Sequence, residues 1–158
     1  GRIKSFFKLS QGEYIAVEKV EAVYTNSSTI INQLCIYGDS NMSFLVGLIG
    51  LDPDHLPTIL SMSDKDLKGL SREAIVEKLN EINLKTKILR QLEDSVQGMG
   101  LQGFEKIKNV YLDIEPFTVE NKMLTPTLKI KRHEVQKIFQ DKISQLYEEG
   151  KLVIDSKL

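Results

Sequence analysis

The sequence predicts an α+β domain, in which a sheet of about three antiparallel strands is flanked by helices and preceded by an N-terminal β-hairpin. Two observations indicate the sheet: the strand-like runs 30–37 and 44–51 lie on either side of a turn cluster, and a third such run covers 106–113. A further observation indicates the helices, because apolar residues recur at helical spacing over much of 58–100 and again near the C-terminal end.

The first half of the chain contains four expected elements. Residues 1–15 are expected to form a short hairpin, because Gln11-Gly12-Glu13 supplies a turn between strand-like segments. A helix is expected over 16–25, where valines recur at helical spacing between charged residues. Only a short loop separates strands 30–37 and 44–51, so an antiparallel pair is the simplest arrangement.

The middle of the chain is expected to be helical. Residues 58–103 are expected to form a helical segment that resembles an insertion. Within it, Ser71 is placed to cap a helix that ends near Asn80, and a second helix covers about 83–99.

The last part of the chain returns to the sheet before ending in a helix. A third strand is expected over 106–113, followed by a loop with two prolines over 114–132. One final helix is expected over 134–149, and Gly150 ends it.

Composition limits the classes of function. The chain has 158 residues, of which 41% are apolar and 27% charged, which is typical of one globular domain. Its formal net charge of −1 argues against a dedicated nucleic-acid binder. Cys35 is the only cysteine, so neither an internal disulfide nor a thiolate metal cluster is expected, and its apolar neighbours indicate a core residue.

Two loops are candidates for function, GRIKSFFKLSQGEYIAVEKVE over 1–21 and LTPTLKIKR over 124–132. Taken alone, the second is a proline-stiffened turn that places Lys129, Lys131 and Arg132 just before a helix. Cations there gain nothing from the helix dipole, and such a mismatch often marks function. A lysine offered to an anionic substrate is one interpretation, and a solvated basic turn is the commoner alternative.

These two loops resemble the two C-terminal signature motifs of the adenylate-forming enzymes. Within that superfamily, KLSQGEYIAVEKVE and LTPTLKIKR are similar to the long-chain fatty acyl-CoA synthetase branch. Other branches usually carry Ser-Gly-Lys where this chain has Thr127-Leu128-Lys129. The resemblance implies that 1–158 is a single mobile C-terminal domain of a larger ligase whose N-terminal adenylation domain is absent here.

The resemblance also implies roles for single residues. Lys129 matches the catalytic lysine of adenylation, Arg2 the arginine that contacts ATP or AMP, and Lys4 the hinge about which the domain turns. Long-chain enzymes commonly have aspartate where Gly1 stands, so the role of that position is open. Glu21 is expected to be structural. The loop that lines the CoA tunnel matches Lys8, Ser10, Gly12, Glu13 and Tyr14.

The implied activity is that of a long-chain fatty acid–CoA ligase, which makes an acyl-adenylate and then an acyl-CoA thioester by domain alternation. Its partners are a long-chain fatty acid, ATP and CoA, bound together with the N-terminal domain of the same chain. Mg²⁺ is expected to be held by that absent domain, so no metal ligand is assigned here, and the isolated chain is expected to be inactive. Peripheral association of the full enzyme with a membrane is compatible with this reading.

Other interpretations stay open at this stage. The chain is also compatible with an adenylate-forming enzyme for another acyl substrate, or with a stand-alone module that binds anions or nucleic acid through LKIKR. The terminal Ser156-Lys157-Leu158 reads as a peroxisomal address if it is the native C-terminus, and otherwise the enzyme is expected to be cytoplasmic or membrane-peripheral.

Overall fold

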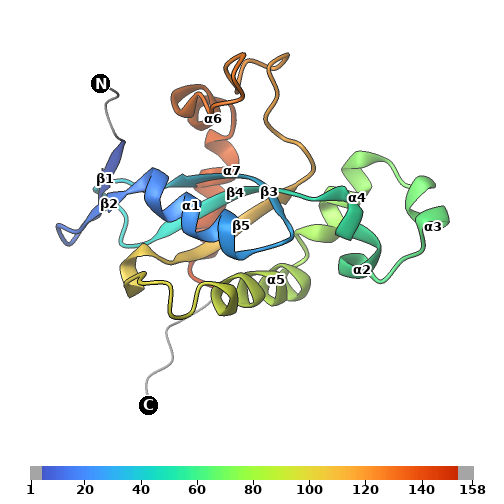
Figure 1. Ribbon diagram of the computed structural model, residues 1–158, viewed down its shortest axis with the longest axis horizontal. Coiled ribbons are helices and arrows are strands. Elements are labelled where there is room, and N and C mark those ends of the chain that lie inside the picture. Colours follow the sequence, from blue (N-terminus) through green and yellow to red (C-terminus); the bar gives the residue numbers. More distant parts are fainter. Residues whose placement is uncertain (1–4, 153–158) are drawn as a thin grey trace.

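A three-stranded sheet lies at the centre of the protein, with a small hairpin at one end and a helical lobe at the other (Figure 1). The structure is a computed structural model, and it describes residues 5–152. The first half of the chain forms the strands β1 (Phe6–Lys8) and β2 (Tyr14–Ala16), the helix α1 (Val17–Ser27), and the strands β3 (Ile31–Tyr37) and β4 (Leu45–Leu51).

Helices dominate the rest of the chain. The lobe contains the short η1 (Pro53–His55) with α2 (Leu56–Leu60), α3 (Asp64–Lys68) and α4 (Arg72–Leu79). The elements that follow are α5 (Ile82–Ser95), the short η2 (Gly103–Glu105), β5 (Ile107–Asp113), α6 (Arg132–Ile138) and α7 (Gln140–Glu149). Among the described residues, no helix is both long and apolar enough to cross a membrane.

The sheet is mixed rather than wholly antiparallel. Its strand order is β3-β4-β5, and β3 and β4 pair antiparallel as predicted. However, β5 pairs parallel with β4, with Gly47 opposite Val110, so the expectation of a third antiparallel strand is wrong. The reason is the long helical connection between them, which carries the chain back to the start of β4 before β5 begins. The α+β class, the three strands and the N-terminal hairpin are confirmed.

Both faces of the sheet are covered by helices, which explains why all seven residues of β4 are buried. Successive side chains of a strand point to opposite faces. Leu45 and Ile49 therefore pack on one face in the cluster that contains residues of α1 and α5. Val46 and Leu48 pack on the other face in the cluster that contains residues of α6 and α7.

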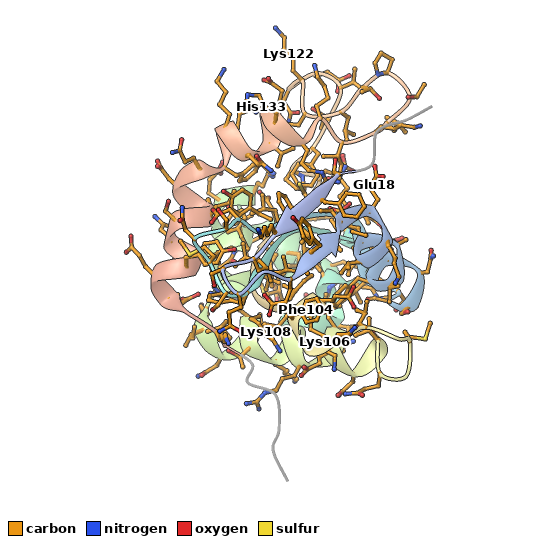
Figure 2. All side chains as sticks on the ribbon, turned by 90° about the vertical axis from the view of Figure 1, so that its left-hand side faces the viewer. Glu18, Phe104, Lys106, Lys108, Lys122 and His133 are labelled. Atoms are coloured by element: carbon orange, nitrogen blue, oxygen red, sulfur yellow. The ribbon has the colours of Figure 1, made fainter. Side chains whose placement is uncertain are left out.

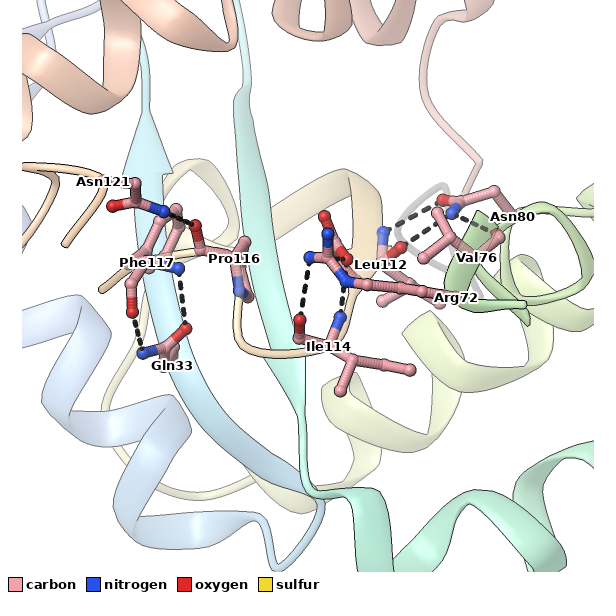
Figure 3. Close-up of polar contacts among 10 residues, drawn as sticks. Gln33, Arg72, Val76, Asn80, Leu112, Ile114, Pro116, Phe117 and Asn121 are labelled. Atoms are coloured by element: carbon pink, nitrogen blue, oxygen red, sulfur yellow. Dashed lines mark hydrogen bonds and ion pairs between the residues drawn. The ribbon is translucent and has the colours of Figure 1, made fainter. Parts of the chain in front are cut away.

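Two amide side chains complete the backbone hydrogen bonding at the outer strands (Figure 3). Asn80, just after α4, accepts from the Leu112 N–H at 2.9 Å and donates to the Leu112 carbonyl at 2.7 Å. Gln33, on β3, donates to the Phe117 carbonyl at 2.7 Å and accepts from its N–H at 3.1 Å. Each amide thus imitates a neighbouring strand, which ties the lobe to β5 and the loop after β5 to β3.

The boundaries of the helices agree only partly with the local signals. The helix expected over about 83–99 ends earlier than predicted, because α5 stops at Ser95 and Val96 is its C-cap. Ser71 caps α4 by accepting from the Ala74 N–H at 3.1 Å, and Gly150 ends α7 with a φ of 86°, both as predicted. The expected single helix over 134–149 is instead two helices that meet at Phe139. The break places the Phe139 ring against the ring of Phe117, with centroids 6.0 Å apart, so tertiary packing overrides the helical periodicity.

Replacing Asn80 by aspartate tests the role of the amide. We expect Asn80→Asp to lower the free energy of unfolding by about 2 kcal/mol, because a carboxylate cannot donate to the Leu112 carbonyl. Denaturant titration followed by circular dichroism measures this. Asn83→Asp is the matched control, since Asn83 is exposed in the first turn of α5, where negative charge is tolerated. Equal stability of the two variants would contradict the proposed role.

Candidate functional site

The loop that carries Lys129 is a small hairpin of its own. Leu124 and Ile130 form an antiparallel bridge, and the Lys131 N–H donates to the Met123 carbonyl at 2.8 Å. Leu124 and Ile130 also pack against the cluster on the α6/α7 face of the sheet. The base of this loop is therefore anchored on the core, although the sequence indicated only an irregular segment.

Thr125 organises the tip of this hairpin. Its N–H donates to the Lys129 carbonyl at 2.8 Å, and its carbonyl accepts from the Leu128 N–H at 2.8 Å. Its Oγ1 accepts from the Lys129 N–H at 3.1 Å and lies 3.1 Å from Thr127 Oγ1. The Lys129 side chain itself is exposed, and none of the ion pairs found within residues 5–152 includes it. Lys129 is therefore an exposed cation on a backbone that several hydrogen bonds hold in place.

Leu128 takes an unusual conformation beside this lysine. It is the last of three residues in the turn, and its φ is 65°. Three-residue hairpin turns favour glycine at this position, because a side chain in the left-handed region costs about 1 kcal/mol. The Leu128 side chain is also 69% exposed. An apolar, conformationally strained residue thus occupies the most prominent place on the turn.

An ion pair joins the ends of the two sequence motifs. Arg132, the first residue of α6, donates from Nη1 to Glu21 Oε2 at 2.8 Å and from Nη2 to Glu21 Oε1 at 2.9 Å. The two side chains are only 16% and 12% exposed. A bidentate pair fixes both the distance and the orientation of its partners. Since the two residues are 111 positions apart, no spacing in the sequence indicated this contact.

The same pair is tied into the sheet through β3. Glu21 Oε2 also accepts from the Ile36 N–H at 2.8 Å. Burial by itself lowers the pKa of Arg132, but the hydrogen bonds and charge of Glu21 outweigh it and raise the pKa above its ordinary value. Burial raises the pKa of neighbouring Cys35 to about 12, so its thiol stays protonated, as befits the predicted core residue. Of the three LKIKR cations, Arg132 is therefore structural, while Lys129 and Lys131 are exposed.

The N-terminal hairpin presents the second group of predicted site residues. Its turn is closed by the Leu9 N–H, which donates to the Glu13 carbonyl at 2.8 Å, and by the Gly12 N–H, which donates to the Leu9 carbonyl at 2.9 Å. Gly12 has a φ of 93°, and a Cβ there would meet no atom within 4 Å. The Ser10 N–H donates to the Met42 carbonyl at 2.9 Å, which holds the turn against the β3–β4 loop.

The outward face of this hairpin carries a cation and an aromatic ring. Lys8 Nζ lies 5.7 Å from the centroid of the Tyr14 ring, which is a cation–π distance. Tyr14 is 64% exposed, whereas one carboxylate oxygen of Glu13 is buried and has no hydrogen-bond partner among the described residues. The turn therefore combines a glycine that has open space around it with polar side chains beside it.

The two loops lie in different parts of the domain. Figure 1 shows the hairpin turn at one end of the sheet and the loop over 124–132 above it. In Figure 2, Lys122 and His133, which flank that loop in sequence, lie at the top, whereas Phe104, Lys106 and Lys108 lie below the hairpin. The loop over 124–132 and the N-terminal hairpin thus occupy different parts of the domain (Figure 1). Arg2, Lys4, Gly1 and the terminal Ser156-Lys157-Leu158 lie outside the described residues.

A groove beside α6 and α7 was not indicated by the sequence. It has a volume of about 800 Å³ and is lined by Tyr37, Met42, His133 and Tyr147, among others. Met42 is the residue that holds Ser10, and His133 follows the LKIKR loop, so the groove borders both motifs. Burial and the hydrogen bond to Asp39 raise the pKa of Tyr37 to about 12, so the Tyr37 hydroxyl stays protonated at neutral pH.

The buried carboxylate of Asp113 already has a charged partner. Asp113 accepts from Arg72 at 2.7 Å, and burial raises its pKa above the ordinary value. Within residues 5–152, no cluster of histidine, cysteine and carboxylate side chains has the arrangement that a metal ion requires.

Comparison with known proteins identifies the class to which this geometry is related. The chain is 43% identical over 147 residues to the long-chain-fatty-acid–CoA ligase 5 of Mus musculus, covering 93% of this chain and 20% of the ligase. It is 40% identical over 150 residues to the peroxisomal acyl-CoA ligase 891 of Penicillium roqueforti, covering 94% and 21% respectively. This chain resembles the C-terminal domain of the long-chain acyl-CoA ligases. It spans about one fifth of the length of these relatives.

Solved structures of adenylation domains contain a region with a similar fold. The adenylation domain of a carboxylate reductase from Mycobacterium chelonae matches with a TM-score of 0.71 and 28% identity, over 90% of this chain and 19% of that one. The corresponding domain from Segniliparus rugosus, in complex with AMP and a carboxylic acid, matches with a TM-score of 0.66 and 25% identity, over 91% and 20%. No family model matches the chain. The similarity to long-chain acyl-CoA ligases predicted from the two motifs is confirmed, whereas the roles of single residues stay predictions.

The ion pair between Glu21 and Arg132 is expected to dominate the stability of this region. Arg132→Met leaves a buried carboxylate without its partner, so we expect it to lower the free energy of unfolding by about 3 kcal/mol. In a Glu21→Met background the same change is expected to cost far less, because no unpaired charge remains. Urea titration of the four proteins in this cycle measures the coupling. Lys131→Met, at an exposed neighbour, is the control, and an equally large loss there would contradict the assignment.

Proposed function

We propose that this chain is the C-terminal domain of an ATP-dependent long-chain fatty acid–CoA ligase, and that it serves both half-reactions. The observation that carries the proposal is the exposed Lys129 on a turn whose backbone is held by Thr125 and whose base is anchored by Arg132. The similarity to long-chain acyl-CoA ligases supports the substrate class. The acyl pocket itself would belong to the larger domain, so the carboxylate-reductase neighbours leave other acids as the alternative.

In the first half-reaction, a carboxylate oxygen of the fatty acid attacks the α-phosphate of ATP, and pyrophosphate leaves. Negative charge accumulates on the phosphate oxygens as the bond to the leaving group breaks. The Lys129 ammonium group would stabilise this charge, and it would do so most effectively if its position were fixed before the reaction begins. The hydrogen bonds around Thr125 supply that fixed backbone, while the flexible side chain supplies the reach.

In the second half-reaction, the thiol of CoA attacks the acyl carbonyl, and AMP leaves. The hairpin turn would line the path of the pantetheine arm, where the open surface at Gly12 allows close approach. Lys8, Ser10, Glu13 and Tyr14 would form the polar rim of this path.

The separation of the two loops supports domain alternation. The hairpin turn and the loop over 124–132 occupy different parts of one domain, so a single orientation would not present both to one site (Figure 1). A rotation about Lys4 would withdraw one loop and present the other. Arg2 would contact the nucleotide near the same hinge.

The rest of the catalytic machinery would belong to the larger domain. Mg²⁺ would be bound there, where it would neutralise phosphate charge. The isolated chain would therefore be inactive. Since several of the similar ligases are named peroxisomal, we also propose that Ser156-Lys157-Leu158 acts as a peroxisomal address wherever it forms the free end of the enzyme.

The role of Lys129 is tested by fatty-acid-dependent ATP–pyrophosphate exchange in the full-length enzyme. We expect Lys129→Ala to lower the exchange rate by about 10²–10³-fold, because one preorganised charge is lost from the transition state. Conversion of preformed acyl-adenylate to acyl-CoA is expected to continue. Lys131→Ala removes a neighbouring exposed cation and is expected to leave both reactions unchanged. Unchanged exchange in Lys129→Ala would refute the proposed function.

The role of the hairpin turn is tested by Gly12→Ala in the same enzyme. The added methyl group meets no atom of this domain, so an effect on thioester formation would report an approaching ligand. We expect acyl-CoA formation from preformed acyl-adenylate to fall about 10-fold or more, while exchange is retained. Gly98→Ala is a matched control, since Gly98 also has a positive φ and open space. The assignment fails if both glycine variants behave alike.

A further inference from the structure

Leu128 combines two features that the fold of this domain does not require. Its φ of 65° lies in the left-handed region, where glycine or asparagine would be accommodated with less strain. Its side chain is 69% exposed and belongs to neither hydrophobic cluster of the core, unlike its neighbours Leu124 and Ile130. The chain therefore keeps an apolar side chain where both backbone strain and solvation disfavour it.

The position of Leu128 indicates where that side chain would be used. It is adjacent to Lys129, and its N–H donates to the Thr125 carbonyl within the turn that holds the lysine. Any surface that receives the Lys129 side chain would therefore meet Leu128 at the same moment. Within residues 5–152, the base of the hairpin packs against the core and its tip projects from it. A surface that contacts the Leu128 side chain would therefore belong to another domain.

We propose that Leu128 is a positioning residue for adenylation, whose side chain packs into an apolar recess of the larger domain and so seats Lys129 against the α-phosphate. This inference rests on the function proposed above and extends it, since it assigns an apolar contact beside the charge. Burial of the side chain in the docked orientation offsets the strain of the left-handed backbone. The contact exists in one domain orientation only, so it favours the first half-reaction and is lost in the second.

The test compares three substitutions in the full-length enzyme. Leu128→Asn suits a positive φ but removes the apolar group, whereas Leu128→Met keeps an apolar side chain of similar volume. We expect Leu128→Asn to lower kcat/KM for ATP–pyrophosphate exchange by about 10-fold or more. The separate variant Leu128→Met is expected to have a kcat/KM close to that of wild type. Ile82→Asn is the control, because Ile82 is an exposed apolar residue on α5, on the other face of the sheet.

Two further readouts separate docking from a merely structural role. Conversion of preformed acyl-adenylate to acyl-CoA is expected to stay unchanged in Leu128→Asn, and its thermal midpoint is expected to be no lower than that of wild type. Wild-type exchange in Leu128→Asn, or an equal fall in both half-reactions, would overturn the inference. Lys129→Ala, assayed in parallel, separates a failure of this inference from a failure of the proposed function. If Lys129→Ala abolishes exchange while Leu128→Asn does not, the proposed function stands and only the role of Leu128 fails.

Discussion

The bidentate pair between Glu21 and Arg132 is the contact on which the arrangement of this domain depends. It connects α1, which follows the N-terminal hairpin, to the first residue of α6, which follows the Lys129 loop. The Ile36 N–H adds the sheet to the same carboxylate. Because an unpaired charge in such a place is very unfavourable, the two partners hold one another in position. Both candidate loops are thereby fixed to a common frame while their tips stay exposed.

The frame itself gains its rigidity from a sheet that is covered on both faces. The apolar residues of β4 contribute alternately to the clusters of α1 and α5 on one side and of α6 and α7 on the other. At the outer strands, Asn80 and Gln33 supply hydrogen bonds that a further strand would have made (Figure 3). The bases of the two loops are therefore held to one frame, as the proposed rotation of the domain about a hinge would require.

Local patterns predicted the elements of this fold better than their relations. Ser71 and Gly150 mark helix ends because capping depends on a few neighbouring residues. The direction of β5 could not be read in this way, because it depends on the path of the intervening helices rather than on the strand. The break at Phe139 had no local signal either, since it depends on an aromatic contact with Phe117 in a distant loop.

The sequence by itself determined the α+β class, the hairpin around Gly12 and the likeness to the C-terminal domain of long-chain acyl-CoA ligases, because periodicity and motif order are written in consecutive residues. The tertiary structure alone decided how the three LKIKR cations differ. Arg132 is partly buried against Glu21, 111 positions away, whereas Lys129 is exposed beside Leu128. Burial is a property of what surrounds a side chain in space, so residues of similar charge in one short motif acquired different roles only when the chain folded.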